Sequence, residues 1–98
     1  MPPLMTVGQL DDLYARLAQV SGMREREWRD VLSLPPADAE QAVNDWFILG
    51  KLSWVKEQSI ADEVLSVLNT IAQWATPLGI IAGTVTGVAG AITAIKGA

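Results

Sequence analysis

The chain contains neither cysteine nor histidine. Disulfide bonds and thiolate chemistry are therefore excluded, and the side chain that most often acts as a general base or a metal ligand is missing. Two pairs of adjacent carboxylates, Asp11–Asp12 and Asp62–Glu63, remain as candidates for acid–base chemistry. Neighbours on a helix point about 100° apart, so neither pair forms a catalytic dyad. We therefore predict a protein that is not an enzyme, with no catalytic residue, no cofactor and no metal site.

Positive charge is scarce, and much of the C-terminal part has no charge at all. The chain has 11 acidic and 7 basic residues, a net charge of −4, and no charged side chain from Val64 to Ile95. An acidic chain is poorly suited to contacting phosphates, so no nucleic-acid partner is expected. We divide the chain into a charged N-terminal helical region, residues 1–57, and an amphipathic-to-apolar C-terminal region, residues 58–98. The first ten residues lack the basic start and apolar core of a signal peptide, so none is expected.

The beginning of the chain predicts two short helices. Thr6 with Gln9 fits a capping box, which marks a helix start, and Gly22 is suited to the end of that helix. A second helix is expected from about residue 23 to residue 34.

Pro36 predicts the start of a third helix, because proline is tolerated in the first turn. Asp38 and Glu40 then lie near the positive end of the helix dipole. Gly50 weakens this helix without necessarily ending it. Each of the three helices is expected to bury one apolar side. These sides consist of Leu10, Leu13, Tyr14 and Leu17 in the first helix, Trp28, Val31 and Leu32 in the second, and Ala39, Val43, Trp46 and Phe47 in the third.

Apolar residues in the C-terminal region recur at alternating spacings of four and three. Such a pattern is typical of a left-handed helical bundle or coiled coil. Residues 58–76 are expected to form an amphipathic helix, and Pro77 marks a kink or short break with helix on both sides. The eleven positions, which we call the heptad stripe, are Ile60, Val64, Val67, Ile71, Trp74, Leu78, Ile81, Val85, Val88, Ile92 and Ile95.

We therefore predict an all-α fold. Short N-terminal helices precede a long, Pro77-kinked apolar C-terminal helix that oligomerises as a coiled-coil-like bundle. The stripe is rich in β-branched residues and has few charges beside it, which favours three or more copies around an axis.

Small side chains form a second stripe on another side of residues 78–95. Gly79, Gly83, Gly87 and Ala91 are spaced by four, which lets helix backbones approach closely, as in membranes. In water the heptad stripe should be buried and this small-residue face exposed; in lipid or in a close-packed assembly the small-residue face would pack on a neighbour. As a helix, residues 78–95 would extend about 27 Å, just short of the roughly 30 Å core of a bilayer. The other helices supply apolar cover for one side only, so other copies, other proteins or lipid are expected against the rest.

Three aromatic residues, Trp46, Phe47 and Trp54, lie close together beside Lys51 and Lys56. Such a cluster is either part of the core or an anchor at a membrane interface or partner surface. Both interpretations stay open from the sequence.

These patterns lead to three functional alternatives. The leading one is a non-enzymatic structural protein, a bacteriophage virion component of the tail or DNA-ejection type, assembled with further copies of itself and other assembly proteins. The second is a membrane-inserted, holin-like or pore-forming oligomer, and the third is a soluble helical adaptor that binds a partner protein. A virion or a membrane is accordingly the expected location.

Overall fold

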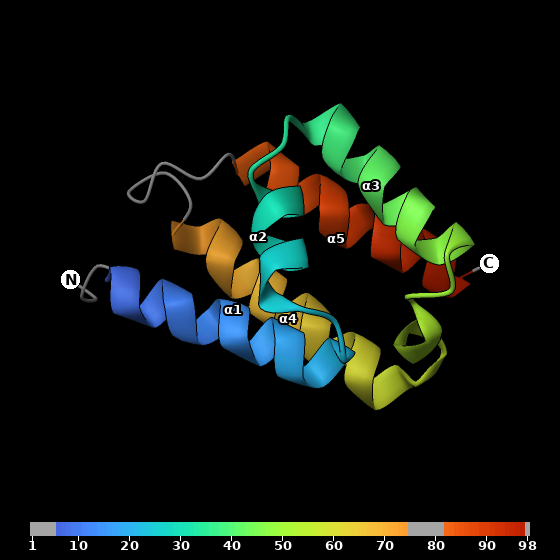
Figure 1. Ribbon diagram of the computed structural model, residues 1–98, viewed down its shortest axis with the longest axis horizontal. Coiled ribbons are helices and arrows are strands. Elements are labelled where there is room, and N and C mark those ends of the chain that lie inside the picture. Colours follow the sequence, from blue (N-terminus) through green and yellow to red (C-terminus); the bar gives the residue numbers. More distant parts are fainter. Residues whose placement is uncertain (1–5, 75–81, 98) are drawn as a thin grey trace.

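Helices make up nearly all of the chain that the structure describes. The computed structural model describes residues 6–74 and 82–97. Within these ranges no β-strand occurs, which confirms the all-α prediction. The elements (Figure 1) are α1 (Val7–Ser21), α2 (Glu25–Leu32), α3 (Pro36–Ile48), the short 3₁₀ helix η1 (Ser53–Lys56), α4 (Gln58–Trp74) and α5 (Ala82–Gly97).

Helix α1 begins and ends where the sequence predicts. The Thr6 Oγ1 accepts a hydrogen bond from the backbone N–H of Gln9 (3.1 Å), and Gln9 Oε1 accepts one from the backbone N–H of Thr6 (2.7 Å). Together these bonds form the expected capping box. Gly22 follows the last turn with a φ of 71°, a left-handed conformation that glycine adopts without strain.

The buried Ser21 side chain joins the end of α1 to α2. Its Oγ donates to the carbonyl of Leu17 (2.6 Å) and accepts from the backbone N–H of Met23 (3.2 Å) and from Nε1 of Trp28 (2.9 Å). Trp28 is fully buried, and its ring packs edge-on against that of Trp46 at 5.0 Å between centroids. Because Nε1 of Trp28 is hydrogen-bonded to Ser21, this indole can be buried without leaving its N–H unpaired.

Helix α3 starts at Pro36 and stops short of Gly50. Gly50 has a φ of 78°, and the backbone N–H of Lys51 donates to the carbonyl of Trp46 at 2.9 Å, which closes the end of the helix. The glycine that the sequence analysis left as a weak helical position therefore lies just after the helix, whose last residue is Ile48.

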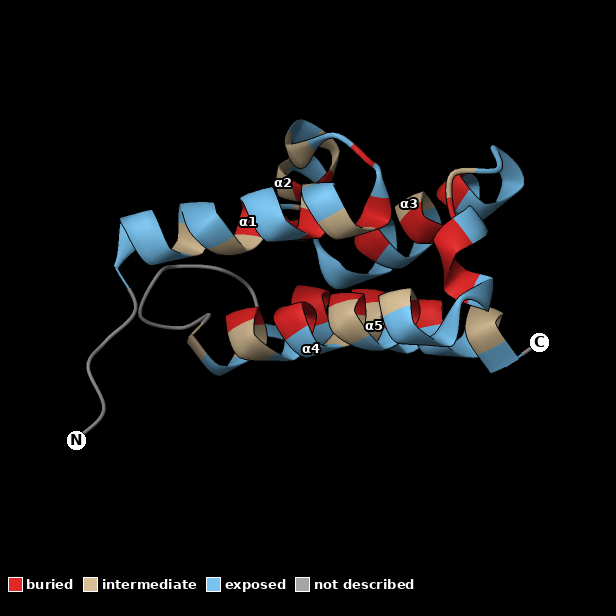
Figure 2. Ribbon diagram, turned by 90° about the horizontal axis from the view of Figure 1, so that it is seen from below, coloured by how far each residue is buried: buried red, intermediate tan, exposed pale blue. Residues whose placement is uncertain are grey.

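The C-terminal region forms two helices, which corrects the prediction of one long helix. Helix α4 ends at Trp74, α5 begins at Ala82, and the two pack side by side in opposite directions (Figure 2). An ion pair of 2.9 Å between Lys96 Nζ and Asp62 Oδ1 joins the end of α5 to the start of α4. In one straight helix these residues would lie about 50 Å apart. Folding back lets the apolar sides of α4 and α5 cover each other within one chain; the predicted kink at Pro77 lies outside the described residues.

The core lies between two layers of helices, with α1, α2 and α3 in one and α4 and α5 in the other (Figure 2). Two bonds join the layers: Thr84 Oγ1 donates to the Leu34 carbonyl (2.6 Å), and Arg16 pairs with Glu63 (2.7 Å). The described parts of residues 1–57 and 58–98 therefore share one core. Its fully enclosed apolar side chains include Leu17, Trp28, Val43, Val55, Val64, Leu68, Ile71, Val85, Val88 and Ile92.

Candidate protein-binding groove

The heptad stripe lies largely inside the chain's own core. Helices α3 and α4 pack on α5 and cover its apolar side, so the buried members of the stripe offer no surface to another copy of the folded bundle. Self-association stays a prediction. The buried members are Val64, Val67, Ile71, Val85, Val88 and Ile92; Ile60, Trp74 and Ile95 are half-buried; Leu78 and Ile81 lie outside the described residues.

The small-residue face of α5 lies on the opposite side of that helix and forms the floor of an open groove beside α3. The groove encloses about 870 Å³. Of the predicted small-residue face, Gly83, Gly87 and Ala91 line it, whereas Gly79 lies outside the described residues. The complete lining is Glu40, Asn44, Ala82, Gly83, Thr86, Gly87, Gly90, Ala91, Ala94 and Ile95. We call this feature the α3–α5 groove.

Helices α3 and α5 run in the same direction along the groove (Figure 1). A Cβ added at Gly83 would lie 3.6 Å from Pro36 Cγ, and one added at Gly87 would lie 3.0 Å from Glu40 Oε1. Successive turns of α3 and α5 therefore lie side by side at these two positions, and the Glu40 carboxylate lies over the floor of the groove. At Gly90, apart from the helix's own backbone, no described atom lies within 4 Å of such a Cβ, so the groove is open there.

A turn of exposed apolar residues lies at the end of α3. Phe47, Ile48 and Leu49 are 51%, 78% and 69% exposed. Ile48 follows Glu40 and Asn44 at the same four-residue spacing, so it continues the α3 wall of the groove. We call residues 47–49 the apolar turn. Contiguous exposed apolar residues of this size are a common mark of an interaction surface.

The predicted aromatic cluster is divided between the core and the surface. Trp46 and Trp54 are buried around Trp28, with Trp54 at 6.3 Å from Trp28 between ring centroids. Trp54 Nε1 has no hydrogen-bond partner among the described residues. Phe47 points out of the core, so its placement on the buried side of α3 was wrong; Ala39, Val43 and Trp46 fill that side.

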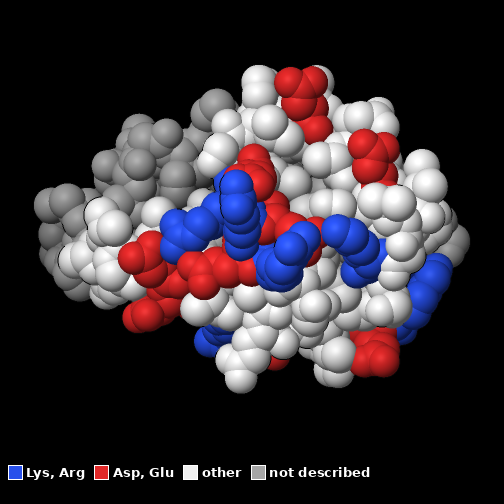
Figure 3. Space-filling view, viewed as in Figure 1, with Lys and Arg blue, Asp and Glu red and all other residues white. Residues whose placement is uncertain are grey.

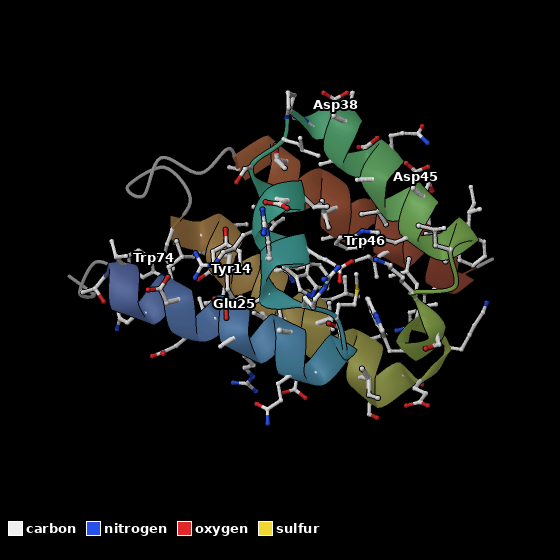
Figure 4. All side chains as sticks on the ribbon, in the orientation of Figure 1. Tyr14, Glu25, Asp38, Asp45, Trp46 and Trp74 are labelled. Carbon is white, nitrogen blue, oxygen red and sulfur yellow. The ribbon has the colours of Figure 1, made fainter. Side chains whose placement is uncertain are left out.

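Three acidic side chains lie on α3, and Glu40 is the one among them that lines the groove. Asp38, Glu40 and Asp45 form no ion pair with any residue in the described ranges. Asp38 and Asp45 point away from the bundle, whereas Trp46 points inwards (Figure 4). In the space-filling view the acidic groups over α3 have no basic neighbour, and the basic side chains gather over the middle of the molecule (Figure 3).

Arg29 on α2 forms ion pairs with α1 and with its own helix. Arg29 Nη2 lies 2.6 Å from Asp11 Oδ1 and 2.8 Å from Glu25 Oε1, and the guanidinium stands 4.4 Å from the centre of the Tyr14 ring. Hydrogen bonds to Asp11 and Glu25 raise the pKa of Arg29, and burial raises the pKa of Tyr14. These contacts hold α1 against α2.

An ion pair between Lys51 and Glu27 joins α2 to the segment after α3. Lys51 Nζ donates a short hydrogen bond to Glu27 Oε2, and Arg24 binds the other carboxylate oxygen. The hydrogen bond from Lys51 is the main cause that lowers the pKa of Glu27. Glu27 is thus held ionised in a structural contact.

Other kinds of site were sought in the same residues. Across residues 6–74 and 82–97, no group of three or more acidic side chains is placed to hold a metal ion. None of the described helices combines the length and apolar character needed to cross a bilayer.

The fold and the groove together define a helical bundle with an open, helix-sized groove on one side. Comparison with protein-family models, with curated proteins and with solved structures finds no match for this chain. Function is therefore argued from the groove alone.

Proposed function

We propose that this chain is a non-enzymatic assembly or adaptor protein that binds a helix of another protein in the α3–α5 groove. The observation that carries the proposal is the presence of Gly83 and Gly90 at exposed helical positions where the fold has room for a larger side chain.

Glycine in the middle of a helix reduces stability by about 0.5–1 kcal/mol relative to alanine. At Gly90, in the middle of α5, the chain's own packing supplies no reason for this loss, because an added Cβ would meet no described atom outside the helix's own backbone. At Gly83, in the first turn of α5, a Cβ would make an ordinary contact. The close approach of a partner helix would explain these glycines, because glycine leaves no side chain between α5 and the backbone of that partner.

The dimensions of the groove suit a helix. Helix α5 lines the groove from Ala82 to Ile95, which corresponds to a floor about 21 Å long, or nearly four helical turns. A helix laid into a groove is a recurrent mode of protein recognition, with anchors at every third or fourth residue. The apolar turn beside one end offers a further contact for such a helix.

Self-association of this chain is a second candidate. The outer side of α5 carries no charge from Ala82 to Ile95, so it could meet the same side of another copy without an opposing charge on either helix. The predicted bacteriophage virion would be one setting for either mode of assembly, and a membrane another; the geometry of the groove favours neither setting.

The proposal is tested by selecting, from a displayed library of helical peptides, those that bind the folded chain. Gly90→Leu fills the open part of the groove without a clash, and Gly97→Leu, at the end of α5 outside the groove, is the matched control. We expect peptides enriched on the wild-type chain and on Gly97→Leu to lose binding to Gly90→Leu. If no enriched peptide depends on Gly90, the proposal is wrong. Sedimentation of the same three proteins measures self-association separately.

A further inference from the structure

Resting on the proposed function, we infer that the helix bound in the α3–α5 groove is a basic one, with a lysine or arginine that meets Glu40. Glu40 is the charged residue that lines the groove, and its Oε1 lies 3.0 Å from where a Cβ of Gly87 would stand. The carboxylate therefore hangs over the floor, where a bound helix must contact it.

Docking of a helix would remove water from this carboxylate. Burying a charge is unfavourable unless the charge is paired, and Glu40 has no ion-pair partner among the described residues. An uncharged or acidic occupant would leave it unpaired. Asp38 and Asp45 point away from the bundle on another side of α3, so the cation is expected to pair with Glu40.

A second copy of the chain fits this wall less well than a basic partner does. Its α5 would bring no charge between Ala82 and Ile95, and Lys96, the next residue, is already paired with Asp62. It would also bring another Glu40, and each copy has a net charge of −4. Charge complementarity therefore points to a different protein as the source of the helix.

The end of the groove specifies a second feature of the partner. Ile95 lines that end, and Ile48 extends the α3 wall beside it. Ile48 is eight residues beyond Glu40 on the same side of α3, about 12 Å along the helix. The bound helix should therefore carry its cation and a large apolar side chain about eight residues apart.

The inference is tested with two synthetic peptides as long as α5. The first is an alanine-rich helix with two lysines spaced by four residues and a leucine about eight residues beyond them, and the second has glutamate in place of each lysine. Binding of both is measured to the wild-type chain, to Glu40→Gln, to Gly90→Leu and to Gly97→Leu. Glu40 is exposed and unpaired, so its replacement should leave the fold intact.

We expect the lysine peptide to bind the wild-type chain and Gly97→Leu equally. Glu40→Gln should weaken that binding about two- to fivefold, as for an exposed ion pair, and Gly90→Leu by about fivefold or more through overpacking. Failure of the lysine peptide to bind, or equal binding of the glutamate peptide, overturns the inference about charge. Equal binding of the lysine peptide to Gly90→Leu overturns the groove itself, and with it the proposed function. A wild-type chain that dimerises, and does so more tightly after Glu40→Gln, would identify a second copy as the occupant and also overturn the inference.

Discussion

Replacing Gly90 by alanine should make the isolated chain more stable. Gly90 is an exposed residue in the middle of α5, and apart from the helix's own backbone no described atom lies within 4 Å of an added Cβ. The substitution therefore adds no clash and removes the conformational freedom that glycine has in the unfolded chain. We expect the free energy of unfolding to rise by about 0.5–1 kcal/mol.

Thermal unfolding followed by circular dichroism measures this change. In a domain of this size, 1 kcal/mol shifts Tm by about 4–8 °C, so a rise of about 2–8 °C is expected. Gly22→Ala is the matched control, because Gly22 has a φ of 71° and alanine is strained there. That variant should be less stable than the wild-type chain.

An unchanged or lower Tm for Gly90→Ala would refute the reasoning. It would mean that the outer side of α5 is not open in the folded chain, and that glycine is needed there for folding. The argument that this glycine serves a binding partner would then fail, whatever the peptides do.

Three further predictions concern buried and ionisable groups. Thr84→Val removes the buried hydroxyl that donates to the partly buried Leu34 carbonyl, so urea unfolding should show a loss of about 1–3 kcal/mol; an unchanged midpoint would contradict this role. Lys51 lowers the pKa of Glu27, so the stability from this contact is present above the ordinary glutamate pKa of 4.5 and is lost as the pH falls from there through the lower folded pKa. Stability should therefore fall less steeply on acidification in Glu27→Gln, and identical pH profiles would be evidence against the contact. Burial raises the pKa of Tyr14 above its ordinary 10.0, so stability should decline as the pH rises through 10 towards the folded pKa. Tyr14 is the only tyrosine, so tyrosinate absorbance reports on it directly, and an ordinary titration in the folded chain would disprove the shift.

Local features of the fold could be predicted from the sequence because neighbouring residues determine them. The capping box of Thr6 and Gln9, the helix end at Gly22 and the first-turn position of Pro36 depend on a few consecutive residues and on backbone geometry. The buried side of α4 followed from its helical period.

The long-range arrangement could not be predicted in the same way. A heptad pattern indicates which side of a helix is buried but not whether the covering helix belongs to the same chain. Val64 and Val85 therefore looked like contacts between copies, although the packing of α4 against α5 in opposite directions lets one chain bury both. Phe47 was misplaced because the apolar spacing continues from Val43, whereas the helix ends one residue beyond it.

Only the α5 side of the groove could be predicted from the sequence. The small-residue period of α5 marked one side of it. Of the described part of this face, Gly83 is exposed, as expected in water, whereas Gly87 and Ala91 are half-buried. The position of Glu40 over its floor was not foreseen, because it depends on α3 lying parallel to α5, and Glu40 and Gly87 are far apart in sequence.

The position of α5 between α3 and α4 has a consequence for synthesis on the ribosome. Of the described helices α5 is translated last, yet it covers apolar residues such as Val43 and Val64, which lie on helices made earlier. A nascent chain that has emerged only as far as α4 exposes those side chains to the solvent and to chaperones. We expect translation halted before residue 82 to yield a product that is degraded, and not a smaller folded protein.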